Sequence, residues 1–329
     1  MRIFIDGFES GGSDLWDQVY GGSLDGTTKK TGTYSFFANN TAYRAKSLAS
    51  AIGTIYFKFY FYFTGSSGFN NPVFSVSNTS GYQVTLYFNN PSRTFCFKLG
   101  GDTGSVLGGL YSPALGVSTW HLVEGKITID NASGVAQLKL NGNAGLDIDF
   151  SGDTQYQSTG QITTVTLGNW TMGSSYYYVD DFVLDDASWI GNTRIQGLVP
   201  TGAGNSAQWT PSTGSNYACV DEVPPNDADY VTTNSNDQVD TYATGNLTGA
   251  IAEVKCVQVQ ARAVKEGTPT PTKLALVVRS GGADYASADQ AVQTYFKSLS
   301  TIWETNPNTS AAWSTSEVDA MEIGIKSRA

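Results

Sequence analysis

The stretch from Thr54 to Phe63 constrains the fold more than any other part of the chain. Ile55 is followed by phenylalanine at every second position as far as Phe63, and tyrosine or lysine fills the positions between them. Successive side chains of a β-strand point to opposite faces, so a period of two collects the phenylalanines on one side, whereas a helix would scatter them around its circumference. The pattern predicts a strand with one apolar and one amphipathic face.

Similar alternating runs recur through the first 190 residues. They lie at 84–88, 95–99, 122–129, 136–140, 162–167 and 176–184, and Asn, Gly and Pro separate them. Many short strands between tight turns are typical of a sandwich or barrel. The composition agrees, with 36 glycines, 12% aromatic residues and only 15% charged residues, where about 25% is usual. Because both faces of the long aromatic strands are partly apolar, we expect a two-sheet jelly-roll sandwich.

The composition and periodicity of the sequence change after Trp189. Residues 191–228 are rich in Gly, Ser, Thr, Pro and Asn and have little periodicity, which favours a connector. Strand patterns resume near Tyr230, with a long strand expected over 250–264, and either a helical turn or a strand over 289–301. The sequence therefore predicts an all-β chain with a jelly roll over 1–190, a connector over 191–228, and a second, smaller β-sandwich-like domain over 229–329.

Charge and cysteine usage restrict the partners that the chain can have. Its net charge is −10 and no basic patch is visible, which disfavours nucleic acid and anionic membrane surfaces. No apolar run resembles a signal peptide or a membrane span, so we expect synthesis and folding in the cytoplasm. The cysteines are Cys96, Cys219 and Cys256, an odd number without a Cys-x-x-Cys spacing. We expect reduced thiols and no zinc site, and a Cys219–Cys256 pair stays open.

The groups that catalysis would need are few. His121 is the only histidine, and it lies beside Trp120 at an expected strand start, where a structural role is the simpler interpretation. Asp147 and Asp149 could share one face of a strand, as the paired carboxylates of a glycosidase must. We expect no enzymatic activity, and a glycoside hydrolase is retained only as a third alternative.

Three segments of the first half resemble a known fold family. They are Phe4–Glu9, Trp120–Glu124 followed by Leu138–Gly142, and Tyr178–Leu184. Their order and spacing resemble the opening, middle and closing strands of the laminin-G/concanavalin-A-like jelly roll found in bacteriophage proteins. The resemblance implies the same two-sheet fold for this part of the chain.

The second half resembles phage virion proteins. The segments concerned are Ile195–Pro200, Tyr217–Pro225, Asn306–Ser314 and Glu317–Lys326. The last two are similar to a common virion-protein ending, with Asn306 where that ending has Asp and Asp319 where it has Asn. The resemblance implies a structural component of a tailed bacteriophage, made in the bacterial host cytoplasm and located in the virion. It would be displayed on the head or tail, with other virion proteins and copies of itself as partners.

A carbohydrate-binding host-adhesion module on a tail fibre or baseplate is the alternative. Exposed aromatic rings can stack on sugar rings of host surface glycans. The candidates are Tyr176, Tyr177, Tyr178 and Trp170, with Tyr60 and Tyr62 as further members. The competing interpretation is that these rings pack against a second sheet or a neighbouring subunit.

A structural calcium ion is the one cofactor considered. Asp180, Asp181 and Asp185 lie in one short segment, and calcium takes six to eight oxygen ligands. Laminin-G-like domains bind calcium near loop tips, which the resemblance extends to these residues, although no EF-hand spacing is present. Asp180 and Asp181 are adjacent in an expected strand and face opposite sides unless a bulge intervenes.

Overall fold

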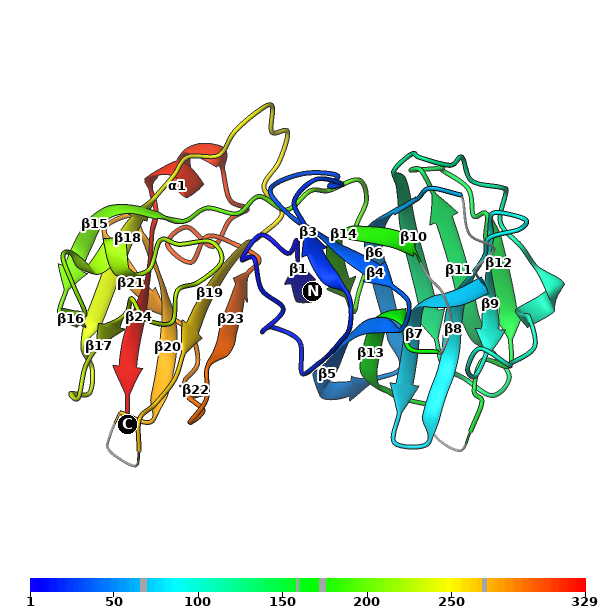
Figure 1. The fold of residues 1–329 in the computed structure, drawn as a ribbon, viewed down its shortest axis with the longest axis horizontal. Helices are drawn as coiled ribbons and strands as arrows, with labels where there is room; N and C mark the ends of the chain where they lie inside the picture. Colours follow the sequence, from blue (N-terminus) through cyan, green and yellow to red (C-terminus); the bar gives the residue numbers. More distant parts are fainter. Residues whose placement is uncertain (66–69, 158–159, 172–175, 268–270) are drawn as a thin grey trace. The chain divides into compact units, whose positions relative to one another are not determined.

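The computed structural model describes residues 1–65, 70–157, 160–171, 176–267 and 271–329. The chain forms two compact units. Unit 1 comprises Met1–Glu9 and Trp16–Ile195, and unit 2 comprises Ser10–Leu15 and Gln196–Ala329. Both are built from strands (Figure 1), and no helix in the described residues is long and apolar enough to cross a membrane.

Unit 1 contains two sheets. Its described elements are β1 (Arg2–Asp6), β2 (Gln18–Tyr20), β3 (Ser23–Asp25), β4 (Ser35–Asn39), β5 (Ala42–Ile52), β6 (Thr54–Phe63), β7 (Asn70–Asn78), β8 (Gly81–Asn89), β9 (Thr94–Leu99), η1 (Leu107–Gly109), β10 (His121–Thr128), β11 (Gly134–Leu140), β12 (Ile148–Gly152), β13 (Ile162–Asn169) and β14 (Tyr176–Asp185). Sheet A has the order β12-β11-β10-β6-β14-β4-β3, with β1 beside β14, and sheet B has the order β2-β5-β13-β7-β8-β9. The all-β jelly-roll prediction is confirmed.

Aromatic rings from the two sheets fill the core of unit 1. Strand β6 coincides with the alternating stretch predicted from the sequence, and its apolar members from Ile55 to Phe63 are completely buried. The Phe61 ring of sheet A lies 4.9 Å from Phe88 and 5.2 Å from Phe95 of sheet B, measured between centroids. These contacts place one face of each sheet against the core, so the intervening side chains of each strand point outward.

In its described residues, unit 2 is a smaller β-structure with one short α-helix. Its described elements are β15 (Pro200–Ala207), β16 (Thr210–Pro211), η2 (Asn216–Cys219), β17 (Val231–Thr232), β18 (Val239–Thr244), β19 (Val257–Ala263), β20 (Lys273–Ser280), β21 (Ala283–Ala286), β22 (Gln290–Ala291), β23 (Lys297–Trp303), α1 (Thr315–Ala320) and β24 (Glu322–Arg328). The main sheet has the order β15-β18-β24-β20-β21, with β22 beside β20, while β16-β17 and β19-β23 form separate pairs. Apolar residues of β19 and β20 pack with Trp313, Val318 and Met321 in its core.

The segment 191–228, expected to be a connector, contains two strands. Within it, β15 pairs with β18 and β16 pairs with β17, so these parts of the segment belong to sheets of unit 2. Strand pairing uses backbone hydrogen bonds, which small polar residues make without an apolar pattern. The strand expected over 250–264 is limited to β19, and 289–301 contains β22 and the start of β23 instead of a helical turn.

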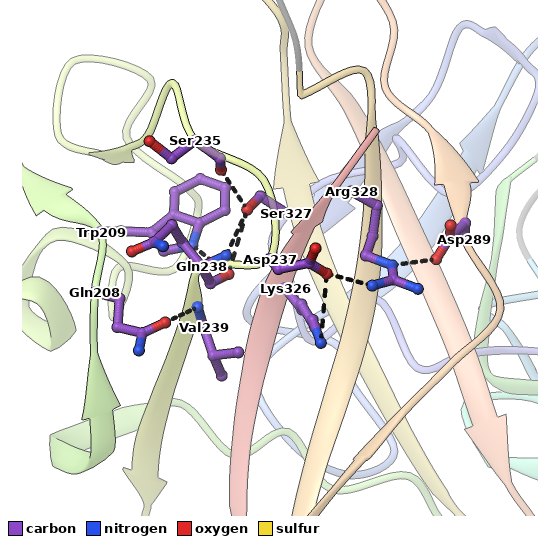
Figure 2. Close-up of polar contacts among 10 residues, drawn as sticks. All are labelled: Gln208, Trp209, Ser235, Asp237, Gln238, Val239, Asp289, Lys326, Ser327 and Arg328. Carbon is purple, nitrogen blue, oxygen red and sulfur yellow. Dashed lines mark hydrogen bonds and ion pairs between the residues drawn. The ribbon is translucent and has the colours of Figure 1, made fainter.

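Polar contacts hold the turn before β18 against the last strand of unit 2 (Figure 2). The carboxylate of Asp237 pairs with Arg328 and lies 3.5 Å from the Lys326 ammonium, and Arg328 also binds Asp289 at 2.9 Å. The Ser327 hydroxyl donates to the carbonyl of Ser235 at 2.7 Å. These ion pairs are partly exposed, so each contributes little to stability.

Candidate functional site

Five partly exposed aromatic side chains form a continuous row on the outer face of sheet A. The members of this aromatic row are Phe37, Tyr62, Trp120, Tyr176 and Tyr178. Strand β14 pairs with both β4 and β6, so Tyr178 lies directly opposite Phe37 on one side and Tyr62 on the other. The row therefore runs across the strands and joins residues from four distant parts of the sequence.

The ring geometry shows that each member of the row contacts the next one along it. Phe37 stacks on Tyr178 with centroids 4.5 Å apart, and Tyr176 lies 6.3 Å from Phe37. On the other side, Tyr62 lies 5.8 Å from Tyr178 and 5.3 Å from Trp120. Because each ring is held by its neighbours, little side-chain entropy remains to be lost when a ligand binds.

Strand alternation decides which of the predicted tyrosines belong to the row. Tyr176 and Tyr178 point outward, and Tyr176 is 42% exposed. Tyr177 points into the core, is completely buried, and donates its hydroxyl to the carbonyl of Pro72 at 3.0 Å. Tyr60 faces outward but is buried. Phe37 and Trp120 were missed by sequence reasoning, since only the pairing of β4, β14 and β6 brings them beside the tyrosines.

Trp170 lies on the outer face of sheet B, away from the aromatic row. Its ring stacks on Tyr82 with centroids 3.9 Å apart and an interplanar angle of 12°. The indole Nε1 donates to the Ser75 hydroxyl at 3.0 Å. Ser75 lies between the buried Phe74 and Val76, which point into the core, so Ser75 and Trp170 are on the outward side.

Asp180 and Asp181 occupy a β-bulge in β14. The register between β14 and β6 shifts between Asp180 and Val183, and Asp181 has a φ of 51°. A bulge inserts an extra residue and redirects the side chains around it. Both aspartates are buried as a result. Burial raises the pKa of both carboxyl groups, and the negative charge of Asp181 raises that of Asp180 further.

Four buried side chains of sheet A bind the chain segment that leaves unit 1. Glu124 accepts a hydrogen bond from the Gly191 amide at 2.6 Å, and Tyr60 donates to the Asn192 side chain. Lys58 donates to the Thr193 carbonyl at 2.6 Å, and Asp181 accepts from the Ile195 amide at 2.6 Å. We call Lys58, Tyr60, Glu124 and Asp181 the exit clamp, because residues 191–195 lead directly to unit 2.

Burial shifts the pKa values of the ionisable groups around the exit clamp. Loss of solvent lowers the pKa of Lys58 to about 8, against the opposing effect of Asp181, Asp180 and Glu124. Burial and the neighbouring Asp181 raise the pKa of Asp180 to about 7, although the amides of Lys30, Thr31 and Asp181 donate to it. Each shift has the sign expected for a charge moved out of water.

These shifts predict that acid stabilises unit 1 relative to neutral pH. A carboxyl group whose pKa is raised by folding stabilises the fold when protonated, and this contribution is lost as the pH rises. Asp180, with a pKa of about 7, and Asp6, with a pKa of about 6, lose it between about pH 4 and pH 7. Unfolding by denaturant at pH 4.5 and pH 7.5 measures the effect. In Asp180→Asn the unfolding free energy should fall less between these two pH values than in the wild type. An equal fall in both proteins would contradict the role given to Asp180.

The structure does not assemble a calcium site from Asp180, Asp181 and Asp185. Backbone amides and the N-terminal amine occupy their oxygens: Asp180 binds the Lys30 amide, and Asp185 binds Met1 and the amides of Ala187 and Ser188. Among the described residues, no group of three or more His, Cys, Asp or Glu side chains is placed to hold a metal ion. The bulge with Asp180 and Asp181 lies in the interior of β14, whereas Asp185 is the last residue of this strand.

The other chemical candidates each make their own structural contacts. His121 is buried, with Nε2 2.8 Å from the Gly116 carbonyl oxygen. Asp147 accepts from the Leu140 amide at 2.7 Å and closes a turn, while Asp149 accepts from Gln137 at 2.8 Å. The three cysteines form no disulfide, so the Cys219–Cys256 pair left open from the sequence is not made.

Comparison with solved structures gave matches that cover about half of this chain. A mutant of alginate lyase Aly36B in complex with an alginate tetrasaccharide is 18% identical, with 56% of this chain and 96% of that chain covered and a TM-score of 0.40. Carbohydrate binding module CBM66 from Bacillus subtilis is 8% identical, with 52% of this chain and 95% of that chain covered and a TM-score of 0.33. Lectin UEA-II complexed with galactose is 9% identical, with 51% of this chain and 98% of that chain covered and a TM-score of 0.33. No family model matches the chain, and the comparison with curated proteins gave no match.

The expectation that the chain is not an enzyme is wrong on this comparison. Structures of alginate lyase and of a Trypanosoma rangeli sialidase, the latter with 30% of its chain covered and a TM-score of 0.34, are among those that it resembles. One histidine with scattered carboxylates was too narrow a ground for excluding catalysis. Nothing in these comparisons indicates a bacteriophage origin.

Proposed function

We propose that unit 1 binds carbohydrate through the aromatic row of sheet A. The observation that carries this proposal is the row itself, in which five rings are partly exposed on one face and held by mutual contact. Buried aromatic rings stabilise a core, but a row left open to solvent is typical of a surface that receives another molecule. Aromatic rings receive the apolar faces of sugar rings in the same way.

The chemistry of the row favours a neutral glycan. None of its five members carries a charge, and their polar atoms are the tyrosine hydroxyls and the Trp120 indole nitrogen. These groups can bind sugar hydroxyls while the rings remove apolar surface from water. The open outer face of a sheet suits an extended polysaccharide chain better than a small buried ligand.

Loss of rings from the row should weaken binding to neutral polysaccharides. Each aromatic contact is worth about 0.5–1.5 kcal/mol, or about two- to tenfold in affinity. Removing two rings with Trp120→Ala and Tyr178→Ala should therefore weaken binding by about one to two orders of magnitude. Affinity gels that contain xyloglucan, arabinoxylan or galactomannan would measure this.

Tyr295→Ala is the matched control. Tyr295 is 61% exposed and belongs to unit 2, so its removal also deletes an exposed tyrosine but leaves the row intact. Thermal unfolding must show that all variants are folded. Equal retardation of wild-type protein and of the Trp120/Tyr178 variant, or no retardation of the wild type by any of the three polymers, would refute the proposal.

A second proposal concerns the place where the protein acts. We infer a location on the particle of a tailed bacteriophage from the segments Asn306–Ser314 and Glu317–Lys326, which resemble the ending of virion proteins. In the structure this region supplies Trp313, Val318 and Met321 to the core of unit 2, so its sequence is under packing constraints as well. Mass spectrometry of purified particles tests the location, and absence of the polypeptide would refute it.

A further inference from the structure

The aromatic side chains on sheet B form a second cluster, which the aromatic row leaves unexplained. Tyr82 and Trp170 stack with an interplanar angle of 12°, and the hydrogen bond from Trp170 to Ser75 fixes the indole. A third ring, Tyr156, is 50% exposed. We call Tyr82, Tyr156 and Trp170 the sheet B cluster.

Two consecutive glycines allow the rings of this cluster to come together. A Cβ atom at Gly100 would lie 2.9 Å from the Tyr156 ring, and one at Gly101 would lie 3.1 Å from the Trp170 ring. The backbone of this dipeptide is thus flanked by both rings. Gln83, next to Tyr82 in β8, holds the backbone of Tyr156 in place, because its side-chain oxygen accepts from the Tyr156 amide at 3.1 Å. The cluster is therefore preorganised by its own contacts.

The chemical character of the sheet B cluster matches that of the aromatic row. Its three rings are partly exposed and uncharged, and the side chains that hold them, Ser75 and Gln83, are neutral hydrogen-bonding groups. Charged ligands would find no opposite charge among these residues. A neutral sugar ring, with one apolar face and several hydroxyls, fits both features.

The two aromatic surfaces point away from each other. Tyr62 lies between the buried Phe61 and Phe63 of sheet A, and Ser75 lies between the buried Phe74 and Val76 of sheet B. Since both sets of buried residues face one shared core, the outward residues lie on opposite sides of the sandwich, separated by two sheets about 10 Å apart. One sugar residue cannot contact both surfaces.

We propose that unit 1 carries a second binding face for neutral glycans, the sheet B cluster, and that the two opposed faces cross-link separate polysaccharide chains. The inference rests on the proposed function of the aromatic row. Two weak sites on one rigid domain hold a polymer more tightly than either alone and join different chains into a network. A single module would thus act as a cross-linker without forming an oligomer.

Binding stoichiometry of the full chain tests the proposal. Calorimetry would use the hexasaccharide fragment of whichever polymer among xyloglucan, arabinoxylan and galactomannan retards the wild-type protein. We expect two hexasaccharides per chain. Trp120→Ala with Tyr178→Ala should reduce the number to one, and Tyr156→Ala with Trp170→Ala should also reduce it to one through loss of the other site. Precipitation of the intact polymer should be lost in both double variants.

The outcomes separate this inference from the proposed function. One hexasaccharide per wild-type chain, lost only in the Trp120/Tyr178 variant, would overturn the second face and leave the first in place. One site lost only in the Tyr156/Trp170 variant would overturn the cross-linking role and refute the aromatic row as the binding site. Because Trp170 supports the fold through Ser75, Tyr156→Ala alone provides a milder variant, for which we expect at least a threefold weaker second site.

Discussion

Replacing Lys58 with methionine should lower the free energy of unfolding of unit 1 by about 3–5 kcal/mol, the usual cost of removing one partner from a buried charged network. Lys58 is completely buried and donates to the carbonyls of Asp181 and Thr193 at 3.2 and 2.6 Å. Methionine keeps most of the apolar length but removes the positive charge. The variant would leave Asp181 and two carbonyls buried without the ammonium group.

The same change should loosen the exit clamp, which limited proteolysis can detect. Residues 191–195 include Arg194, a trypsin site. The residues Gly191, Thr193 and Ile195 on either side of it are held by Glu124, Lys58 and Asp181. Faster cleavage after Arg194 in Lys58→Met than in the wild type is expected. Global unfolding alone would expose all trypsin sites together, so selective cleavage at this position distinguishes local release from loss of the fold.

Lys126→Met provides the control. Lys126 also lies in sheet A and faces outward, but it is partly exposed and contacts the Tyr56 ring at 5.7 Å from its centroid. We expect a loss of about 1 kcal/mol or less, since exposed cation–π contacts are weak. Equal destabilisation by both substitutions, measured by chemical denaturation, would contradict a special role for Lys58.

Replacing Asp240 with alanine should destabilise unit 2 by about 3–5 kcal/mol. The carboxylate is completely buried and accepts hydrogen bonds from the amides of Gln208 and Trp209 at 2.6 and 2.8 Å. It also accepts from the side chains of Asn216 at 2.5 Å and Tyr242 at 3.0 Å. Alanine would remove the acceptor that these four donors share.

Asp237→Ala is the matched control for this prediction. Asp237 is only three residues away and also forms ion pairs, with Lys326 and Arg328, but it is exposed (Figure 2). Exposed pairs contribute about 0–1 kcal/mol. The loss of unfolding free energy, measured by urea denaturation, should therefore be severalfold larger for Asp240→Ala than for Asp237→Ala. A loss at Asp240 no larger than that at Asp237 would show that the buried hydrogen bonds contribute little.

Local patterns in the sequence were sufficient for the strongest elements. The alternation from Thr54 to Phe63 predicted β6 to the residue, since period-two burial is a property of any strand with one apolar face. Helix α1 was missed, although its capping box of Ser314 and Glu317 is a recognisable local signal. Strand β15 was also missed, because its small polar residues carry no apolar period.

The candidate site depended much more on tertiary structure. Tyr176 and Tyr178 could be named from the sequence, but Tyr177 was assigned to the same surface and proved to be in the core. Alternation along β14 would have separated them, had the orientation of the strand been known. The sequence has no signal for the partners Phe37 and Trp120, because they are brought into the row by strand pairing over more than 50 residues of chain.

By itself, the sequence determined that unit 1 is a sandwich of alternating strands, since local periodicity follows from the geometry of a single strand. Tertiary structure decided what its outer faces can do. Whether an outward side chain is exposed, as in Tyr62, or covered, as in Lys58 beneath residues 191–195, depends on which distant segment crosses that face. Such coverage is set by long-range pairing and by the bulge at Asp180 and Asp181, which a local pattern does not record.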